Sequence, residues 1–382
     1  MKLSNELQQV INATRGKPLI NIQNHDFSWD IFVQLAIRHC LVPLIYKNLE
    51  TSPQVPPEIL LRLKQYSSKI KFGTLHNTAE VLRITKFFEQ KQTELIFIKG
   101  LPLALYLFGD PDLRQSCDID FFVRESDLHI IVGLMSELGY LVAHPRYALD
   151  GKRLKYHLKN FRDIVFVNSH RKTSVEVHFK LGYRWVDFLS FDQLHKHYIS
   201  YKNTNIPTLC HEENFVFLVL NGASDGWRYL RGLYDIVKYI EQQPSLNWQI
   251  VWQISNQLKV TDIISQTLIL VNNVFAVKLP DGVIQIHHNV RTNKLVRLSL
   301  DSIMNAPRIN GIYDRMFYKH YFSYYLCLEQ SLIGKIKSVA GVLIDLTRVF
   351  NKINLPDSIF FLYYILYPFI IIGIFVPKKY RK

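Results

Sequence analysis

Residues 96–123 read IFIKGLPLALYLFGDPDLRQSCDIDFFV and contain two short apolar runs, separated by a glycine, a helical segment and a polar loop. The pattern predicts a buried strand at residues 95–98, a turn at Lys99-Gly100 and an apolar helix over residues 101–108. A glycine turn that opens a helix directs backbone N–H groups and the positive end of the helix dipole at one point. We therefore expect this turn to bind a phosphate group.

Asp118 and Asp120 stand two residues apart inside the second apolar run. In an extended strand alternate side chains share one face, so both carboxylates point the same way. Two like charges on one face repel each other unless a cation lies between them. The spacing predicts a divalent metal, Mg²⁺ or Mn²⁺, beside the phosphate-binding turn, and together these are the two halves of a nucleoside triphosphate site.

A third acid stands in the segment TSVEVHF, residues 173–179. Its strict alternation places Glu176 and His178 on one face of a strand and the apolar residues on the other. If this strand neighbours the one with Asp118 and Asp120, Glu176 completes a set of three carboxylates. Such a set holds two metals, or one metal and a general base. We interpret His178 as a supporting or core histidine.

These residues resemble a known family. The signature of the bacterial nucleotidyltransferase-like family, related to the DNA polymerase β superfamily, is similar to Lys99-Gly100, Leu103, Ala104, Tyr106, Arg114 and Asp118-Ile119-Asp120. Farther along, Leu230, Leu233 and Asp235-Ile236 resemble the helical region after the catalytic core of that family. The resemblance covers most of residues 29–367. It implies an α+β fold: a polymerase-β-like core with a short mixed sheet, N-terminal helices and a C-terminal helical domain.

The resemblance also implies an activity, in which an acceptor hydroxyl attacks the α-phosphate of a nucleoside triphosphate and pyrophosphate leaves. Asp118 and Asp120 would hold Mg²⁺ or Mn²⁺, and Glu176 would bind a second metal or take the acceptor proton. Lys99 and Gly100 would bind the phosphates. The acceptor is a polysaccharide precursor, a protein or a transfer RNA; the residues do not distinguish these, nor do they identify the base of the nucleotide.

Arg114 has two interpretations, a phosphate contact or an ion pair with Asp110 or Asp112 on the same loop. The sequence departs from the family pattern twice. Leu101 follows the turn glycine where a small residue is usual, and residues 221–225 lack the histidines that the family commonly carries there. The metal-binding acids are intact, which favours an active enzyme.

Two other functions use the same residues. One is a non-catalytic scaffold that binds nucleotide at the membrane, beside an envelope or polysaccharide assembly. The other is a toxin-like enzyme that modifies transfer RNA and exploits a basic surface, consistent with the net charge of +14.

Changes of pattern along the chain predict four segments. These are a helical segment at residues 1–90, the α/β nucleotidyltransferase core at 91–205, a helical domain at 206–350 and a hydrophobic segment with a basic tail at 351–382.

Residues 359–376 carry no charge, and a cluster of basic residues follows: Lys378, Lys379, Arg381 and Lys382. The length is just sufficient to cross a bilayer, but Pro368 interrupts it. A spanning helix, an interfacial helix and a helix buried against the helical domain all explain these residues. We expect a cytoplasmic protein, with a membrane surface as partner of residues 359–382 at the inner face.

The four cysteines are scattered without the C-x-x-C pairing of zinc sites: Cys40, Cys117, Cys210 and Cys327. Since the first ten residues are polar and do not form a secretory signal, we expect reduced thiols. His195-x-His197 and His287-His288 lack cysteine or carboxylate partners at ligand spacing, so the sequence argues against zinc.

Overall fold

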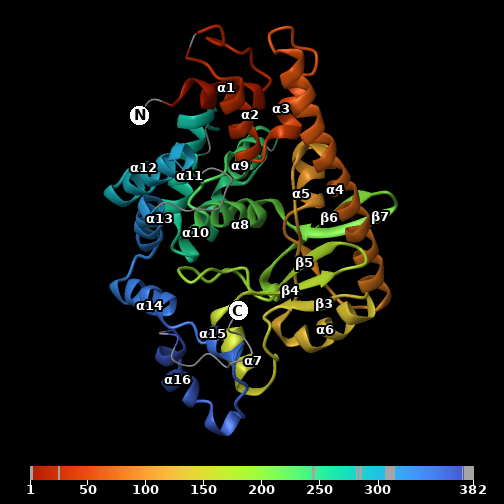
Figure 1. Ribbon diagram of the computed structural model, residues 1–382, viewed down its shortest axis with the longest axis vertical. Helices are drawn as coiled ribbons and strands as arrows, with labels where there is room; N and C mark the ends of the chain where they lie inside the picture. The colour runs from red at the N-terminus through yellow and green to blue at the C-terminus, as the bar shows by residue number, and fades with distance from the viewer. Residues whose placement is uncertain are drawn as a thin grey trace. The chain divides into compact units, whose positions relative to one another are not determined.

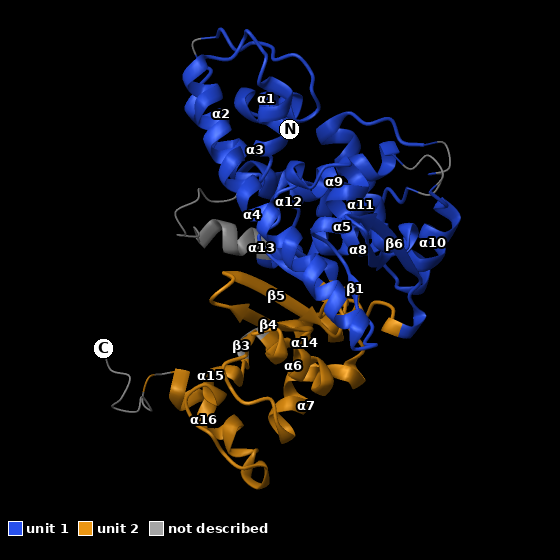
Figure 2. Cartoon of the chain, turned by 90° about the vertical axis from the view of Figure 1, so that its right-hand side faces the viewer, with its two compact units in different colours: residues 1–120, 192–328 blue, residues 121–191, 329–382 orange. Residues whose placement is uncertain are grey.

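The computed structural model describes residues 3–24, 26–242, 246–280, 283, 286–305, 315–371 and 373. The chain forms two compact units, each built from two segments (Figure 2). Unit 1 consists of residues 1–120 and 192–328, and unit 2 consists of residues 121–191 and 329–382. The sequence pattern predicted four consecutive segments, whereas each of these units combines two separate segments. The four-segment division stays a prediction.

Unit 1 contains most of the helices, which are labelled in Figure 1. Its first segment holds α1 (Asn5–Thr14), α2 (Trp29–Arg38), α3 (Val42–Leu49), α4 (Pro57–Gln90), β1 (Ile96–Phe97), α5 (Leu101–Phe108), the 3₁₀ turn η1 (Pro111–Leu113) and the start of β2 (Ile119–Phe122). Its second segment holds β6 (Lys196–Tyr201), β7 (Thr204–Leu209), α8 (His211–Ser224), α9 (Leu230–Gln242), α10 (Trp248–Gln257), α11 (Thr261–Phe275), α12 (Val290–Asn305) and α13 (Arg315–Leu328).

The strands of unit 1 follow the order β2-β1-β7-β6. β1 and β7 are parallel, with Phe97 opposite Thr208, whereas β6 and β7 form an antiparallel hairpin. Helix α4 packs against β7 and α5, and α5 packs against α9. Helix α8 is buried on almost every side, as expected for the apolar run at residues 215–220, and it contacts α9, α10 and α11. This packing positions α5, and with it the turn between β1 and α5.

Unit 2 combines a small sheet with short helices. It contains η2 (Glu125–Asp127), α6 (Leu128–Glu137), β3 (Leu141–His144), α7 (Gly151–Asn160), β4 (Asp163–Asn168), β5 (Thr173–His178), α14 (Leu332–Leu343), α15 (Thr347–Phe350), η4 (Asp357–Ile359) and α16 (Leu362–Ile371), and η3 (Phe191–Gln193) begins at its boundary. Its strand order is β3-β4-β5-β2. Strand β2 belongs to both units, since the boundary between them falls after Asp120 and the strand continues into Phe121. β3 and β4, and β4 and β5, pair antiparallel.

The apolar segment before the C-terminus packs within unit 2. Tyr363 and Ile370 of α16 are buried in a cluster with Tyr147, Val349 and Phe350. The Tyr363 hydroxyl accepts a hydrogen bond from the Leu355 N–H at 2.8 Å. One face of α16 therefore belongs to the core of this unit. One interpretation of the sequence placed the segment against the helical domain at residues 206–350, and its partners include Tyr147 as well as residues at the end of that range.

No helix among the described residues is both long enough and apolar enough to span a bilayer. Helix α16 has ten residues and includes Pro368. The predicted basic cluster, from Lys378 to Lys382, lies outside the described residues.

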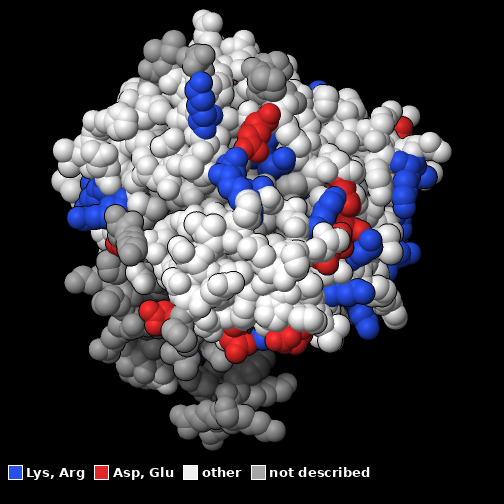
Figure 3. Space-filling model, turned by 90° about the horizontal axis from the view of Figure 1, so that it is seen from above, with Lys and Arg blue, Asp and Glu red and all other residues white. Residues whose placement is uncertain are grey.

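The α+β fold class expected from the sequence is confirmed, since parallel and antiparallel pairs occur together and helices precede and follow the strands. On the face drawn in Figure 3, basic side chains stand in small groups with acidic side chains among them. The positive net charge thus forms no single continuous patch over the described residues of that face.

Candidate functional site

The turn between β1 and α5 has a backbone conformation that glycine adopts readily and other residues do not. Gly100 has φ +71° and ψ −131°. A Cβ at this position would meet only the Ser116 Oγ, at 3.9 Å, so the requirement comes from the backbone and not from crowding. No side chain caps α5, and helix geometry leaves the N–H groups of its first turn without an intrahelical acceptor. These donors suit a phosphate oxygen.

The two aspartates lie next to this turn. Asp118 is half-buried directly before β2, and Asp120 stands within β2 with 1% of its surface exposed. The Ile98 N–H donates to the Asp120 carbonyl at 3.2 Å, which brings Lys99 alongside β2. The Lys99 Nζ lies 3.3 Å from the Asp120 Oδ1. The buried carboxylate thus has a cationic partner, as a charge in such a position requires.

One pocket of unit 1 collects the predicted residues of this region. It is lined by Lys99, Gly100, Arg114, Asp118 and Asp120. Helix α4 adds polar side chains to the wall: Thr74, Asn77 and Thr78. The glycine turn and both aspartates therefore face the same space, which is the arrangement that the spacing in the sequence predicted.

Arg114 pairs with a residue that the sequence did not suggest. Its Nε lies 3.1 Å from both carboxylate oxygens of Asp235, and its Nη2 lies 3.0 Å from Asp235 Oδ2. Both side chains are 4% exposed. Asp112, one of the two expected partners, pairs instead with Lys71 at 2.7 Å, and Asp110 accepts the Asp112 N–H. Arg114 thus links the loop before β2 to α9, and its contact with a phosphate stays a prediction.

Glu176 and His178 belong to β5 in unit 2. They share one face, with Glu176 half-buried, His178 buried and 3.6 Å between His178 Nε2 and Glu176 Oε2. β5 neighbours β2 in this unit, where the Val123 N–H donates to the His178 carbonyl at 2.9 Å. The predicted adjacency of these two strands is confirmed. The role of Glu176 as third carboxylate stays a prediction.

Residues 25–276 match a sequence family described as uncharacterised nucleotidyltransferase. The chain belongs to this family. The matched region includes the glycine turn, both aspartates, Glu176 and the helices from α8 to α11. Membership confirms the resemblance seen in the sequence; the bacterial origin stays a prediction.

The crystal structure of an antigenic nucleotidyltransferase-like protein from Paracoccidioides brasiliensis is also similar to this chain. The two share 13% sequence identity over 55% of this chain and 96% of the other, with a TM-score of 0.29. No curated protein matches the sequence.

Helix α9 carries a charged residue near the site that sequence reasoning missed, Arg231. The guanidinium of Arg231 has a buried Nε and donates through Nη1 to the Gln115 carbonyl. Burial by itself lowers the pKa of Arg231, but Cys40, Asp235 and Asp118 outweigh this effect and raise the pKa. Arg231 is therefore a fixed positive charge whose field reaches Asp118. The family-like run that begins at Leu230 was the signal available in the sequence, although it assigned no role to the arginine.

The donor set of this pocket fits a divalent cation. Carboxylate oxygens are the protein ligands that Mg²⁺ prefers, and both aspartates line the pocket beside N–H groups that suit phosphate. Lys99 and Arg231 supply positive charge around the same carboxylates. The pocket therefore offers ligands for a metal and donors for an anionic substrate.

Proposed function

We propose that this protein is an active, metal-dependent nucleotidyltransferase that transfers a nucleoside monophosphate from a nucleoside triphosphate to an acceptor hydroxyl. The observation that carries the proposal is the single pocket shared by the Lys99-Gly100 turn and by Asp118 and Asp120. Family membership supports the reaction class. A phosphate-binding turn alone or a pair of aspartates alone would support only binding.

In the proposed reaction the acceptor oxygen forms a bond to the α-phosphorus, and the bond from this phosphorus to the oxygen that bridges the α and β positions breaks. Pyrophosphate leaves with the electrons of that bond. The Gly100 turn and Lys99 bind and orient the phosphates, which aligns the incoming and leaving oxygens. Glu176 takes the proton of the acceptor hydroxyl.

Asp118 and Asp120 would hold Mg²⁺, or Mn²⁺, and Glu176 would complete the carboxylate set. The support for Glu176 is the course of β2: the strand continues from Asp120 into residues 121–123, which lie next to β5. When bound, the metal neutralises charge on the phosphates and on the leaving pyrophosphate. The residues around it hold the substrate in place and contribute the fixed charges of Lys99 and Arg231.

The test uses the full-length protein with nucleotides labelled with ³²P at the α or, separately, the γ position, together with Mg²⁺ and RNA, protein and lipid-saccharide fractions of the host. We expect label from the α-phosphate alone in one fraction. Asp118→Asn should lower this transfer at least about 10²-fold, because the metal loses a charged ligand. Asp112→Asn, an acid of the same loop that does not line the pocket, should leave transfer unchanged.

The labelled fraction would also identify the acceptor class among a polysaccharide precursor, a protein and a transfer RNA. Label in transfer RNA, with growth arrest on expression that Asp120→Ala relieves, would indicate the toxin-like enzyme. If the protein bound triphosphate but no fraction became labelled, the result would contradict catalysis. It would support the alternative function, a non-catalytic scaffold that binds nucleotide.

We further propose that unit 2 contacts a membrane surface through α16. The face of this helix opposite the buried Tyr363 exposes large apolar side chains: Tyr364, Ile365, Phe369 and Ile371. Phe361, directly before the helix, is exposed as well. Exposed apolar residues gathered on one short segment mark an interaction site. The basic residues that follow in the sequence suit anionic lipid headgroups.

A further inference from the structure

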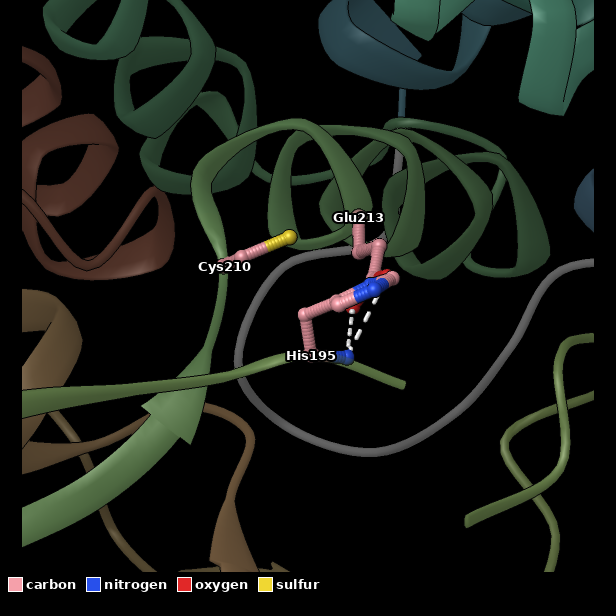
Figure 4. A group of neighbouring side chains, drawn as sticks. All are labelled: His195, Cys210 and Glu213. Carbon is pink, nitrogen blue, oxygen red and sulfur yellow. Dashed lines mark hydrogen bonds and ion pairs between the residues drawn. The ribbon is translucent and has the colours of Figure 1, made fainter. Parts of the chain in front are cut away.

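A second group of ligand-type side chains lies in unit 1, outside the pocket of the aspartates. His195 precedes β6, Cys210 follows β7, and Glu213 stands in the first turn of α8. Figure 4 shows these three side chains converging from the three elements. The spacing argument against zinc considered His195 only with its neighbours in the sequence, and its partners here are 15 and 18 residues away.

The β6–β7 hairpin brings His195 and Cys210 together. Lys196 lies opposite Leu209, and the register extends by one more pair, since the Cys210 N–H donates to the His195 carbonyl at 3.0 Å. Directly opposite residues of an antiparallel pair have their side chains on the same face. The imidazole and the thiol therefore share one side of the hairpin end.

Glu213 approaches this pair from α8. Its carboxylate accepts the His195 backbone N–H at 3.0 Å and lies 2.8 Å from the His195 Nδ1. The Glu213 side chain is 5% exposed, whereas that of His195 is 81% exposed. A buried carboxylate that depends on a solvent-exposed imidazole is a place where a bound cation would add stability.

We propose that His195, Cys210 and Glu213 form a zinc site that fastens the β6–β7 hairpin to α8. One ligand atom from each residue lies within 4.8 Å of the other two. Zinc bonds of roughly 2.0–2.3 Å place tetrahedral ligand atoms about 3.3–3.8 Å apart. Binding therefore requires shifts of about 1 Å or less, and the His195 Nδ1 and the Glu213 Oε1, now 2.8 Å apart, must separate slightly. The exposed His195 side chain can supply this movement, and its solvent side leaves the fourth position for water.

The donor types select the metal. Nitrogen, sulfur and carboxylate oxygen together suit Zn²⁺, whereas Mg²⁺ takes oxygen ligands and would prefer the aspartate pocket. Burial raises the pKa of Cys210 to about 12, so zinc must displace the thiol proton when it binds.

The test is cobalt substitution in the full-length protein, stripped with chelator and kept in excess Mg²⁺. We expect one equivalent of Co²⁺ to produce a thiolate-to-cobalt charge-transfer band in the near ultraviolet, and Zn²⁺ to abolish it. The band should disappear in Cys210→Ser and persist in Cys117→Ser, whose cysteine is exposed beside Asp118. Loss in Cys117→Ser with retention in Cys210→Ser would overturn the proposal, as would the absence of any band.

Direct zinc titration gives the second measurement. His195→Ala removes a ligand that is largely exposed, so the fold should persist while zinc affinity falls more than about tenfold. His197→Ala, two residues along the same strand face, is the matched control and should keep the affinity of the unmodified protein. Equal affinity of His195→Ala and the unmodified protein would contradict the site.

Discussion

Gly100 is the residue on which the phosphate-binding turn depends. Gly100→Ala should cost about 1–3 kcal/mol of stability or shift the turn, because φ +71° with ψ −131° is strained for any residue with a Cβ. In either case the N–H groups of α5 lose their alignment, and triphosphate affinity should fall. Titration of nucleotide binding and urea unfolding would measure both effects.

The control is Gly133→Ala, because this glycine lies within α6 and nothing stands within 4 Å of the added Cβ. It should be neutral or stabilise by up to about 1 kcal/mol. Unchanged nucleotide affinity in Gly100→Ala would show that the turn does not bind phosphate.

His39 should make the stability of unit 1 depend on pH. Burial, with a smaller effect of Arg38, lowers its pKa from 6.5 to about 3. Between pH 6.5 and about pH 3, His39 binds a proton in the unfolded chain but not in the folded chain. The free energy of unfolding should therefore be fully maintained above about pH 6.5 and fall by about 1.4 kcal/mol per unit as the pH drops towards 3.

His39→Asn tests this dependence, because its side-chain oxygen can replace the Nδ1 that accepts the Leu230 N–H at 3.2 Å. Urea unfolding at several values between pH 7 and pH 4 should show a shallower decline in the variant. Parallel declines in the two proteins would assign the pH dependence to other groups.

Among the elements, α9 and the loop before β2 are joined by the Arg114–Asp235 pair. Both side chains are buried, so removing one partner leaves an uncompensated charge. Asp235→Asn should lower the free energy of unfolding by about 3–5 kcal/mol. The double variant Arg114→Met/Asp235→Leu should recover most of this loss, because neither member of the pair is left buried without its partner. Urea unfolding of the single and double variants measures this difference. An equal decrease in the free energy of unfolding in both variants would contradict a large cost of the unpaired charge.

The hairpin of β6 and β7 shows why some elements escaped sequence reasoning. Its turn at Lys202 and Asn203 has positive φ at both positions, 47° and 58°, a conformation usually signalled by glycine. Without glycine the turn left no clear mark in the sequence. β3 was missed for another reason: it is a mostly exposed edge strand, so its side chains carry no alternating burial pattern. The apolar helix over residues 101–108, by contrast, was predicted from its pattern and occurs as α5.

For the molecule as a whole, the exposed face of α16 predicts binding to anionic membranes. The full-length protein should sediment with vesicles of phosphatidylserine and phosphatidylcholine, and less so at high salt. Ile365→Glu should weaken this binding roughly tenfold or more, since an apolar side chain that enters the interface contributes about 1.5–3 kcal/mol. Leu75, on α4 of unit 1, has a similarly exposed side chain. The Leu75→Glu variant is the control and should bind the vesicles like the unmodified protein. No sedimentation with anionic vesicles would remove the membrane proposal.

The sequence alone determined the local parts of the nucleotide site: the turn at Gly100, the helix after it and the strand with Asp118 and Asp120. These features depend on interactions over a few residues, namely hydrophobic period, backbone freedom and alternation along a strand. The part of the family signature from Lys99 to Asp120 was readable for the same reason, since it falls within this short stretch.

Only the tertiary structure decided which distant residues become partners. Asp235 reaches Arg114 across 121 positions, and Cys210 and Glu213 meet His195 through a hairpin and the start of a helix. Side-chain chemistry makes each of these pairings favourable but does not specify it, because many acids and cations of the chain would satisfy the same rule. The choice follows from packing. Burial of the apolar faces contributes most of the driving force for folding and determines which polar residues come together. Those buried polar residues must then form hydrogen bonds or ion pairs with one another.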